Sequence, residues 1–273
     1  MGCVISNPTT LEKYAGETLV YQPGVSNKTT SIYIGKKTLW KLCKGKHEVV
    51  CQTFMNNYRV KRLSQKVPMI VAPQKILKIS KTEIAISMNH YPGDLFSLTL
   101  APFDFKRVLK GFEDVVKAID FLHSKGLAHR DIKPENIVVD QHFFRLIDFD
   151  FTSPLTNFIH CGTKNYIYPD ENDWSARDRS TRYDIYALGR TILYVYYCAA
   201  LLEMIDHISL MKKLFINNVV ITDVENPFTS NSEVKHWFDV ALKCCSEVPH
   251  LTVPTTDDTI ASLQMVDADD IVA

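Results

Sequence analysis

The spacing of two carboxylates, Asp131 and Asp148, constrains this chain more than any other feature. Asp131 lies in the run His129-Arg130-Asp131-Ile132-Lys133-Pro134-Glu135-Asn136, and Asp148 lies in Leu146-Ile147-Asp148-Phe149-Asp150. The intervening residues 137–147 contain two short runs of β-branched and aromatic side chains around a turn, which predicts two paired strands. We therefore expect both carboxylates at the ends of those strands, facing one cleft.

These side chains suit phosphoryl transfer from a nucleotide. That reaction needs one carboxylate facing the acceptor hydroxyl, a second holding Mg²⁺ against the phosphates, and an amide oxygen as a further metal ligand. Asp131 is predicted to take the first place, and Asp148 and Asn136 are the predicted metal ligands. An acidic turn is otherwise a solvated loop, but an ordered run followed by Asp-Phe favours the functional interpretation.

The chain resembles a eukaryotic-type protein kinase, and the similarity can be followed from about Ser31 to Leu263. A lysine two residues after the catalytic aspartate, here Lys133, resembles the pattern of the serine/threonine branch of that family. The resemblance implies an α+β, bilobal fold with a small β-rich N-lobe and a larger, mainly helical C-lobe. It also implies transfer of the γ-phosphoryl group of Mg-ATP to Ser or Thr hydroxyls of a protein substrate, with Asp131, Lys133 and Asn136 as catalytic residues.

The resemblance divides the chain into four parts. Residues 1–16 form an N-terminal segment, 17–91 the kinase N-lobe, 92–264 the C-lobe and 265–273 an acidic tail. Small size and sparse insertions suggest a compact, divergent member, and a viral source is one suggestion.

Composition indicates a globular chain. Its 273 residues are 46% hydrophobic, enough for one large domain or two lobes. Lys plus Arg and Asp plus Glu both count 31, so no net charge favours a nucleic-acid partner. The seven cysteines lack metal-ligand spacing, which predicts reduced thiols and a cytoplasmic protein. The apolar run 191–202 is too short to cross a bilayer and is expected to form a buried helix.

The first six residues, Met1-Gly2-Cys3-Val4-Ile5-Ser6, fit the N-myristoylation pattern. Cys3 is available for palmitoylation, and two acyl chains would anchor the protein where one binds only marginally. An ordinary unmodified start is the alternative. The pattern therefore predicts membrane contact through acylated Gly2 and Cys3.

The N-lobe contains the residues expected to bind ATP. Gly24 lies where the family has its Gly-rich loop, but it is the only glycine left of that pattern, so fewer backbone N–H groups approach the phosphates. Lys41, on the alternating strand 37–43, takes the place of the family's phosphate-binding lysine. A register slip of one residue would turn Lys41 to the other face. Three neighbouring lysines are rivals for this role: Lys36, Lys37 and Lys44.

Two further sets of nucleotide contacts are left open by the sequence. Glu48 opens a predicted helix over residues 48–55, where it either pairs with Lys41 or is a first-turn glutamate favoured by the helix dipole. Met88 and Tyr91 are similar to the gatekeeper and the adenine-binding hinge. Asp94 either reaches the ribose or caps the helix that starts at Leu95.

The large lobe supplies supports for the catalytic run. Helical spacing predicts an amphipathic helix over residues 105–125, ended by Gly126. By resemblance, His129 has a scaffold role, Thr163 braces Asp131 and Lys133, and Asp184 anchors the catalytic-loop backbone. Arg130 resembles the arginine that senses a phosphorylated loop, although the short loop equally favours constitutive order. The candidate phosphorylation sites are Thr152, Ser153 and Thr156.

Asp150 departs from the family, which has glycine after Asp-Phe. Its carboxylate either assists cation binding or restricts the loop. Asp150, the reduced Gly-rich loop and the open Lys41–Glu48 pair motivate an alternative, a pseudokinase that binds partners through the kinase fold. The retained catalytic residues argue against it. A lipid-anchored adaptor is a third hypothesis.

Overall fold

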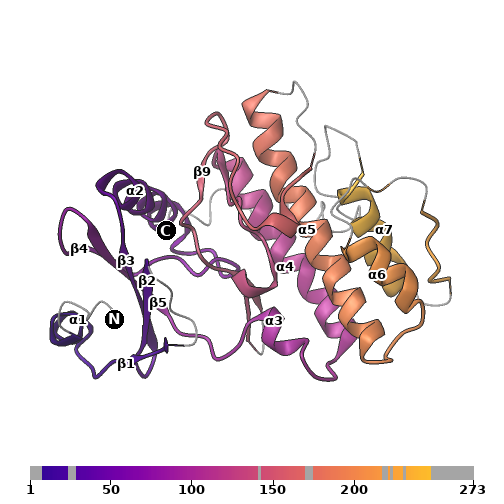
Figure 1. Cartoon of the computed structure of the whole chain (residues 1–273), viewed down its shortest axis with the longest axis horizontal. Coiled ribbons are helices and arrows are strands. Elements are labelled where there is room, and N and C mark those ends of the chain that lie inside the picture. Colours follow the sequence, from indigo (N-terminus) through magenta and orange to yellow (C-terminus); the bar gives the residue numbers. More distant parts are fainter. Residues whose placement is uncertain are drawn as a thin grey trace.

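Two lobes make up the molecule, a small one built on a β-sheet and a larger helical one (Figure 1). The computed structural model describes residues 8–23, 29–140, 143–169, 175–216, 221, 224–229 and 232–246. Gly2, Cys3, Gly24 and the acidic tail lie outside the described residues.

The small lobe is an antiparallel sheet of five strands in the order β1-β2-β3-β5-β4. Its strands are β1 (Val20–Tyr21), β2 (Thr30–Ile34), β3 (Thr38–Lys44), β4 (Lys75–Lys78) and β5 (Glu83–Asn89). The helices α1 (Pro8–Ala15) and α2 (His47–Ser64) belong to the same lobe. In the central pair, Lys41 of β3 lies opposite Ile86 of β5.

Alternation along β3 divides the apolar side chains of the sheet between two small cores. Trp40 and Leu42 point to one face, where Leu11 of α1 packs with them. Cys43 points to the other face, where Val50 of α2 packs. The residues on either side of Lys41 are thus held in the first core, which places Lys41 on the α2 face.

Helix α1 was not expected from the sequence, which predicted only an N-terminal segment over residues 1–16. It forms because Leu11 can be buried against the outer face of the sheet, and this side chain is only 3% exposed. The Glu12 carboxylate also accepts a hydrogen bond from the Leu19 N–H at 3.1 Å. The small lobe therefore includes part of that segment.

Helix α4 (Phe105–Ser124) is the amphipathic helix that the sequence predicts, with its apolar face buried in the large-lobe core. Asp104 caps its start by accepting a hydrogen bond from the Arg107 N–H at 3.0 Å. Gly126 follows its end with φ of 72°, a conformation that favours glycine. The prediction of where this helix ends is confirmed.

Helix α5 (Ala176–Leu201) runs through the large lobe and is buried on nearly all sides. It contains most of the apolar run 191–202, which is therefore the buried helix expected. No helix among the described residues is long and apolar enough to cross a membrane.

Short elements complete the lobe and carry the loops of the site. They are α3 (Leu95–Leu98), β6 (Leu127–Ala128), η2 (Pro134–Asn136), β7 (Ile137–Val139), β8 (Phe144–Leu146), β9 (Ser153–Pro154), η3 (Lys164–Tyr166), α6 (Ile208–Ile216) and α7 (Ser232–Cys244). Strands β7 and β8 pair antiparallel, as the sequence predicted for residues 137–147. The α+β, bilobal, kinase-like fold expected from the sequence is confirmed.

Candidate active site

Asp184 of α5 holds the backbone of the catalytic loop. This fully buried carboxylate accepts hydrogen bonds from the backbone N–H groups of His129 at 2.8 Å and Arg130 at 2.7 Å, and lies 2.8 Å from the His123 Nε2 atom. Burial opposes its ionisation, but these partners outweigh burial and hold the pKa of Asp184 below its ordinary value. The loop is thereby fixed in a shape in which Arg130 has φ of 70°.

Asp131 lies at the centre of a hydrogen-bonded group. Its Oδ1 accepts from the Thr163 hydroxyl at 2.8 Å, and its Oδ2 lies 3.0 Å from Lys133 Nζ and 2.9 Å from Asn136 Nδ2. Lys133 also donates to the Thr163 hydroxyl at 2.8 Å. Thr163 is therefore placed against both Asp131 and Lys133, as the sequence analysis expected.

Asp148 follows β8 and adopts φ of 63°, which turns its carboxylate toward the same cleft. Burial would raise the pKa of Asp148, but the Lys41 charge outweighs it, with His129 and Lys133 adding to the effect, and the pKa is lowered. Lys133 is thus near both Asp148 and Asp131. Asp131 and Asp148 therefore share Lys133 as a neighbour.

This donor set suits Mg²⁺, which binds one or two carboxylates and completes its shell with waters and phosphate oxygens. The Asn136 amide nitrogen donates hydrogen bonds to the Asp131 carbonyl oxygen at 2.7 Å and to the Asp131 carboxylate. The Asn136 carboxamide oxygen takes no part in these bonds and is available to bind a metal. Within the described residues, no three His, Cys, Asp or Glu side chains gather into an all-protein metal cage.

Lys41 of β3 reaches into the cleft from the small lobe. Its Nζ lies 2.7 Å from Asp148 Oδ1 and 2.7 Å from Asp150 Oδ2. Burial lowers the pKa of Lys41, but Asp148 and then Asp150 raise it more, so the ammonium stays charged. Among the rival lysines, Lys44 pairs with Glu83 at 2.6 Å, and Lys36 and Lys37 are exposed.

The pair between Lys41 and Glu48, one of the two alternatives for Glu48, is not formed. Glu48 lies in the first turn of α2 and is exposed, while the Lys41 ammonium has its ion pairs with Asp148 and Asp150. Of the two interpretations open from the sequence, the structure has the first-turn glutamate favoured by the helix dipole. Glu48 is removed from the candidate nucleotide-binding residues.

Asp150 has a contact that sequence reasoning missed. Besides Lys41, its carboxylate accepts a hydrogen bond from Asn57 Nδ2 at 3.0 Å, and its backbone oxygen accepts one from Asn56 Nδ2 at 2.6 Å. Burial, and then the Asp148 charge, raise the pKa of Asp150. The signal in the sequence is the pair Asn56-Asn57 inside a helix, where two neighbouring asparagines interrupt the apolar spacing.

The hinge residues lie between the lobes. Met88 is buried at the end of β5 opposite Leu39, next to the expected nucleotide cleft. Asp94 caps α3 by accepting from the Ser97 N–H at 2.7 Å, so the capping interpretation is the one formed. The Arg145 guanidinium lies over the Tyr91 ring, with its central carbon 5.4 Å from the ring centroid.

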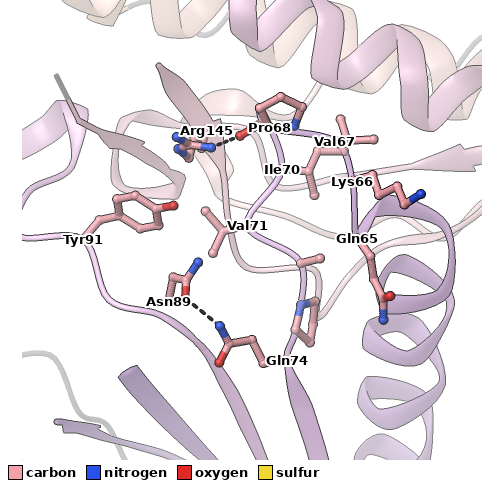
Figure 2. A pocket seen from close by; sticks show the side chains of 12 residues that line it. Gln65, Lys66, Val67, Pro68, Ile70, Val71, Gln74, Asn89, Tyr91 and Arg145 are labelled. Carbon is pink, nitrogen blue, oxygen red and sulfur yellow. Dashed lines mark hydrogen bonds between the residues drawn. The ribbon is translucent and has the colours of Figure 1, made fainter. Parts of the chain in front are cut away.

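A pocket of about 530 Å³ lies beside the hinge, on the side where Tyr91 meets Arg145 (Figure 2). Arg145 is held there by Asp140 at 2.8 Å and by a hydrogen bond to the Pro68 carbonyl oxygen. None of the lining residues is Lys41, Asp131, Asn136 or Asp148. Of the candidate site residues that the structure describes, Tyr91 alone lines this pocket.

Arg130 is occupied by backbone oxygens of the loop that follows Asp148. Its guanidinium donates to the carbonyl oxygens of Pro154 and Ile159, both at 3.4 Å, and to that of Asn157, and it donates to the Ser180 hydroxyl at 3.0 Å. Of the candidate phosphorylation sites, only Thr156 is exposed, whereas Thr152 and Ser153 are buried.

Comparison with known proteins matches residues 18–259 to the protein kinase domain. The chain is 31% identical over 125 residues to the interferon-induced, double-stranded RNA-activated protein kinase of Rattus norvegicus, which is 43% of this chain and 24% of that protein. It is 30% identical over 138 residues to CBL-interacting serine/threonine-protein kinase 15 of Arabidopsis thaliana, 47% of this chain and 32% of that protein. The matches thus span a third or less of these relatives. Because the domain match covers most of the sequence, the chain belongs to the protein kinase domain family.

Proposed function

We propose that this chain is a serine/threonine protein kinase that transfers the γ-phosphoryl group of Mg-ATP to protein hydroxyls. The observation that carries the proposal is the hydrogen-bonded group of Asp131, Lys133, Asn136 and Thr163, with Asp148 facing it. The family supports phosphoryl transfer to a protein. The contacts of Lys133 and Thr163 support the serine/threonine class.

Asp131 is assigned to the acceptor hydroxyl, which it orients and whose proton it accepts. Lys133, 3.0 Å from that carboxylate, neutralises the negative charge that gathers on the transferred group. Asp148 and Asn136 would hold the metal, and Lys41 would contact the nucleotide phosphates. A bound Mg²⁺ supplies charge stabilisation between phosphate oxygens. All five side chains are held by contacts with other residues of the site.

Phosphate transfer tests this proposal directly. Purified protein is incubated with labelled Mg-ATP and a basic substrate protein, beside Asp131→Ala and Asp148→Ala. We expect label on serine or threonine for the parent chain and a loss on the order of 10³-fold or more in both variants. Label confined to tyrosine would contradict the serine/threonine class.

Thermal unfolding with Mg-ADP separates the enzyme from a binding module. Wild type and Asp131→Ala are expected to gain stability from the nucleotide, because Asp131 is assigned to the acceptor hydroxyl. If the wild-type protein shows no phosphate transfer and its Tm does not change with nucleotide, the result favours a pseudokinase that engages partners through the same fold.

We also propose that the protein works in the cytoplasm and contacts membranes through acylated Gly2 and Cys3. The proposal is supported by the N-terminal pattern and by the six described cysteines, which are free thiols. Cell fractionation is expected to find the parent chain in the membrane pellet and Gly2→Ala in the supernatant. Cys3→Ser should be distributed between the two, since one acyl chain binds marginally. Membrane retention of Gly2→Ala would refute acylation at this glycine.

A further inference from the structure

Lys41 is held by two carboxylates that lie close together in the sequence. Asp148 and Asp150 each approach its ammonium to 2.7 Å, and the lysine side chain is only 10% exposed. Asp148 is assigned to the metal under the proposed function, on which this inference rests. Asp150 is then the carboxylate that remains to position Lys41.

Asp150 is itself tied to helix α2. One carboxylate oxygen, Oδ2, faces Lys41, and the other, Oδ1, accepts from Asn57 Nδ2 at 3.0 Å. Asn57 Nδ2 also donates to the Thr53 carbonyl oxygen at 3.0 Å, and Asn56 Nδ2 donates to the Asp150 carbonyl oxygen at 2.6 Å. Asn56 and Asn57 are each 2% exposed. The helix, the loop and the strand lysine are therefore joined through the Asp150 side chain, which is 21% exposed.

Protein kinases require an ion pair between the strand lysine and a glutamate of this helix. In this chain the only glutamate of α2, Glu48, is exposed in its first turn. The helix presents asparagines to the site instead, and an asparagine can donate a hydrogen bond but carries no charge for Lys41. The charge missing from the helix stands at position 150, where the family has glycine.

We propose that Asp150 replaces the helix glutamate as the positioning residue for Lys41, and that Asn57 couples it to α2. A charge-assisted contact links Lys41 to Asp150, and a hydrogen bond links Asp150 to the helix. This explains why one chain has both an aspartate where the family has glycine and no glutamate of α2 paired with Lys41. The Asp150 carboxylate supplies the negative charge that the helix lacks.

Binding of Mg-ADP, measured by calorimetry, tests the positioning role. Asp150→Asn keeps the size of the side chain and removes its charge, and we expect its Kd for Mg-ADP to rise about tenfold. Asn57→Ala, which leaves both carboxylates in place, should raise Kd less. Glu48→Gln is the matched control on the same helix and should bind as wild type does. A larger effect for Glu48→Gln than for Asp150→Asn would overturn the proposal.

The link can also be measured without nucleotide. Asp150→Ala and Asn57→Ala should each lower Tm, and the double variant should lose less than the sum of the two, because each change removes the hydrogen bond between Asp150 and Asn57. Additive losses would show that Asp150 and Asn57 act independently and would overturn the coupling to α2.

The outcomes separate this inference from the proposed function. If wild type transfers phosphate and binds Mg-ADP, and Asp150→Asn does both equally well, the inference fails while the kinase assignment stands. If Asp150→Asn alters the half-saturating Mg²⁺ concentration but leaves metal-free ADP binding unchanged, Asp150 serves the metal and the positioning role is overturned. If wild type neither transfers nor binds, the kinase assignment fails, and the inference fails with it.

Discussion

Gly162 lies where the backbone before Thr163 passes close to the catalytic loop. Its φ is 120°, and a Cβ atom at this position would lie 2.6 Å from the Arg130 carbonyl oxygen. The next residue, Thr163, contacts Asp131 and Lys133. A glycine is needed here because any side chain pushes the catalytic loop and Thr163 apart.

Gly162→Ala should therefore lower both stability and activity. We expect a loss of about 2 kcal/mol in the free energy of unfolding, from the unfavourable φ and the contact with Arg130. Phosphate transfer should fall on the order of tenfold, since a small displacement of Thr163 misaligns Asp131. Urea unfolding and initial rates measure the two effects.

Gly93→Ala is the control for that change. The added Cβ would meet no heavy atom within 4 Å, and Gly93 has no positive φ. Its stability and rate should remain near those of the parent chain. Equal behaviour of the two variants would contradict the steric argument for Gly162.

At the level of single residues, sequence reasoning worked where the chemistry lies in one continuous run. Asp131, Lys133 and Asn136 are separated by few residues, so their contacts follow from local geometry. It left the role of Glu48 open, because the side of a helix that faces a distant lysine depends on packing of the whole lobe. It missed the contacts of Asp150 for the same reason, since Asn57 lies 93 residues away in the chain.

Helix α5 supports the catalytic loop through a charge that titrates at acid pH. Asp184 has a pKa below that of the unfolded chain, for which about 3.9 is typical, so ionised Asp184 stabilises the fold. That contribution is complete above about pH 5 and is lost as pH falls through the lowered pKa. The acid sensitivity of the loop is thus expected below about pH 4.

Asp184→Asn should remove this dependence. Above pH 5 we expect a loss of about 3 kcal/mol, because the two loop N–H groups lose a charged acceptor inside the core. The difference in the free energy of unfolding between the variant and wild type should become smaller below about pH 4, where the Asp184 carboxylate of wild type takes up a proton. Chemical unfolding across pH 2.5 to 7 measures it, with exposed Asp120→Asn as the control. A gap that is constant with pH would contradict the assignment.

Helix α1 is expected to be an integral part of the small lobe. Leu11→Ala removes a side chain that is 3% exposed and packs with Trp40 and Leu42, which should cost about 2–3 kcal/mol. Tyr14→Ala on the same helix changes a side chain that is 50% exposed and should cost far less. Equal, small losses in thermal unfolding would mean that α1 is not part of the core.

For the whole molecule, the resemblance to protein kinases implied the two lobes, and helical spacing predicted the helix over residues 105–125. The sequence pattern ended the helix after Glu48 at Met55, whereas α2 continues to Ser64. The reason is that Asn56 and Asn57 interrupt the apolar pattern of the helix, and both donate hydrogen bonds to Asp150. The local rule failed where the helix meets the site.

In the whole molecule, the contacts of the candidate active site join the small lobe to the large one. Lys41 already contacts Asp148, and Thr163 already contacts Asp131. Arg130, the residue that would bind a phosphorylated loop, instead donates to carbonyl oxygens of that loop and to Ser180. Order that other kinases gain from a phosphate is here supplied by the backbone.

Activity should accordingly be independent of phosphorylation. Phosphatase-treated protein is expected to transfer phosphate at the untreated rate and without a lag, because no phosphate is needed to bring the loop to Arg130. Thr156→Ala, which removes the exposed hydroxyl among the candidate sites, should leave the rate within about twofold. A lag that preincubation with Mg-ATP abolishes, or a fall in rate after phosphatase treatment, would mean that a phosphate does part of the work assigned here to Arg130 and the loop carbonyls.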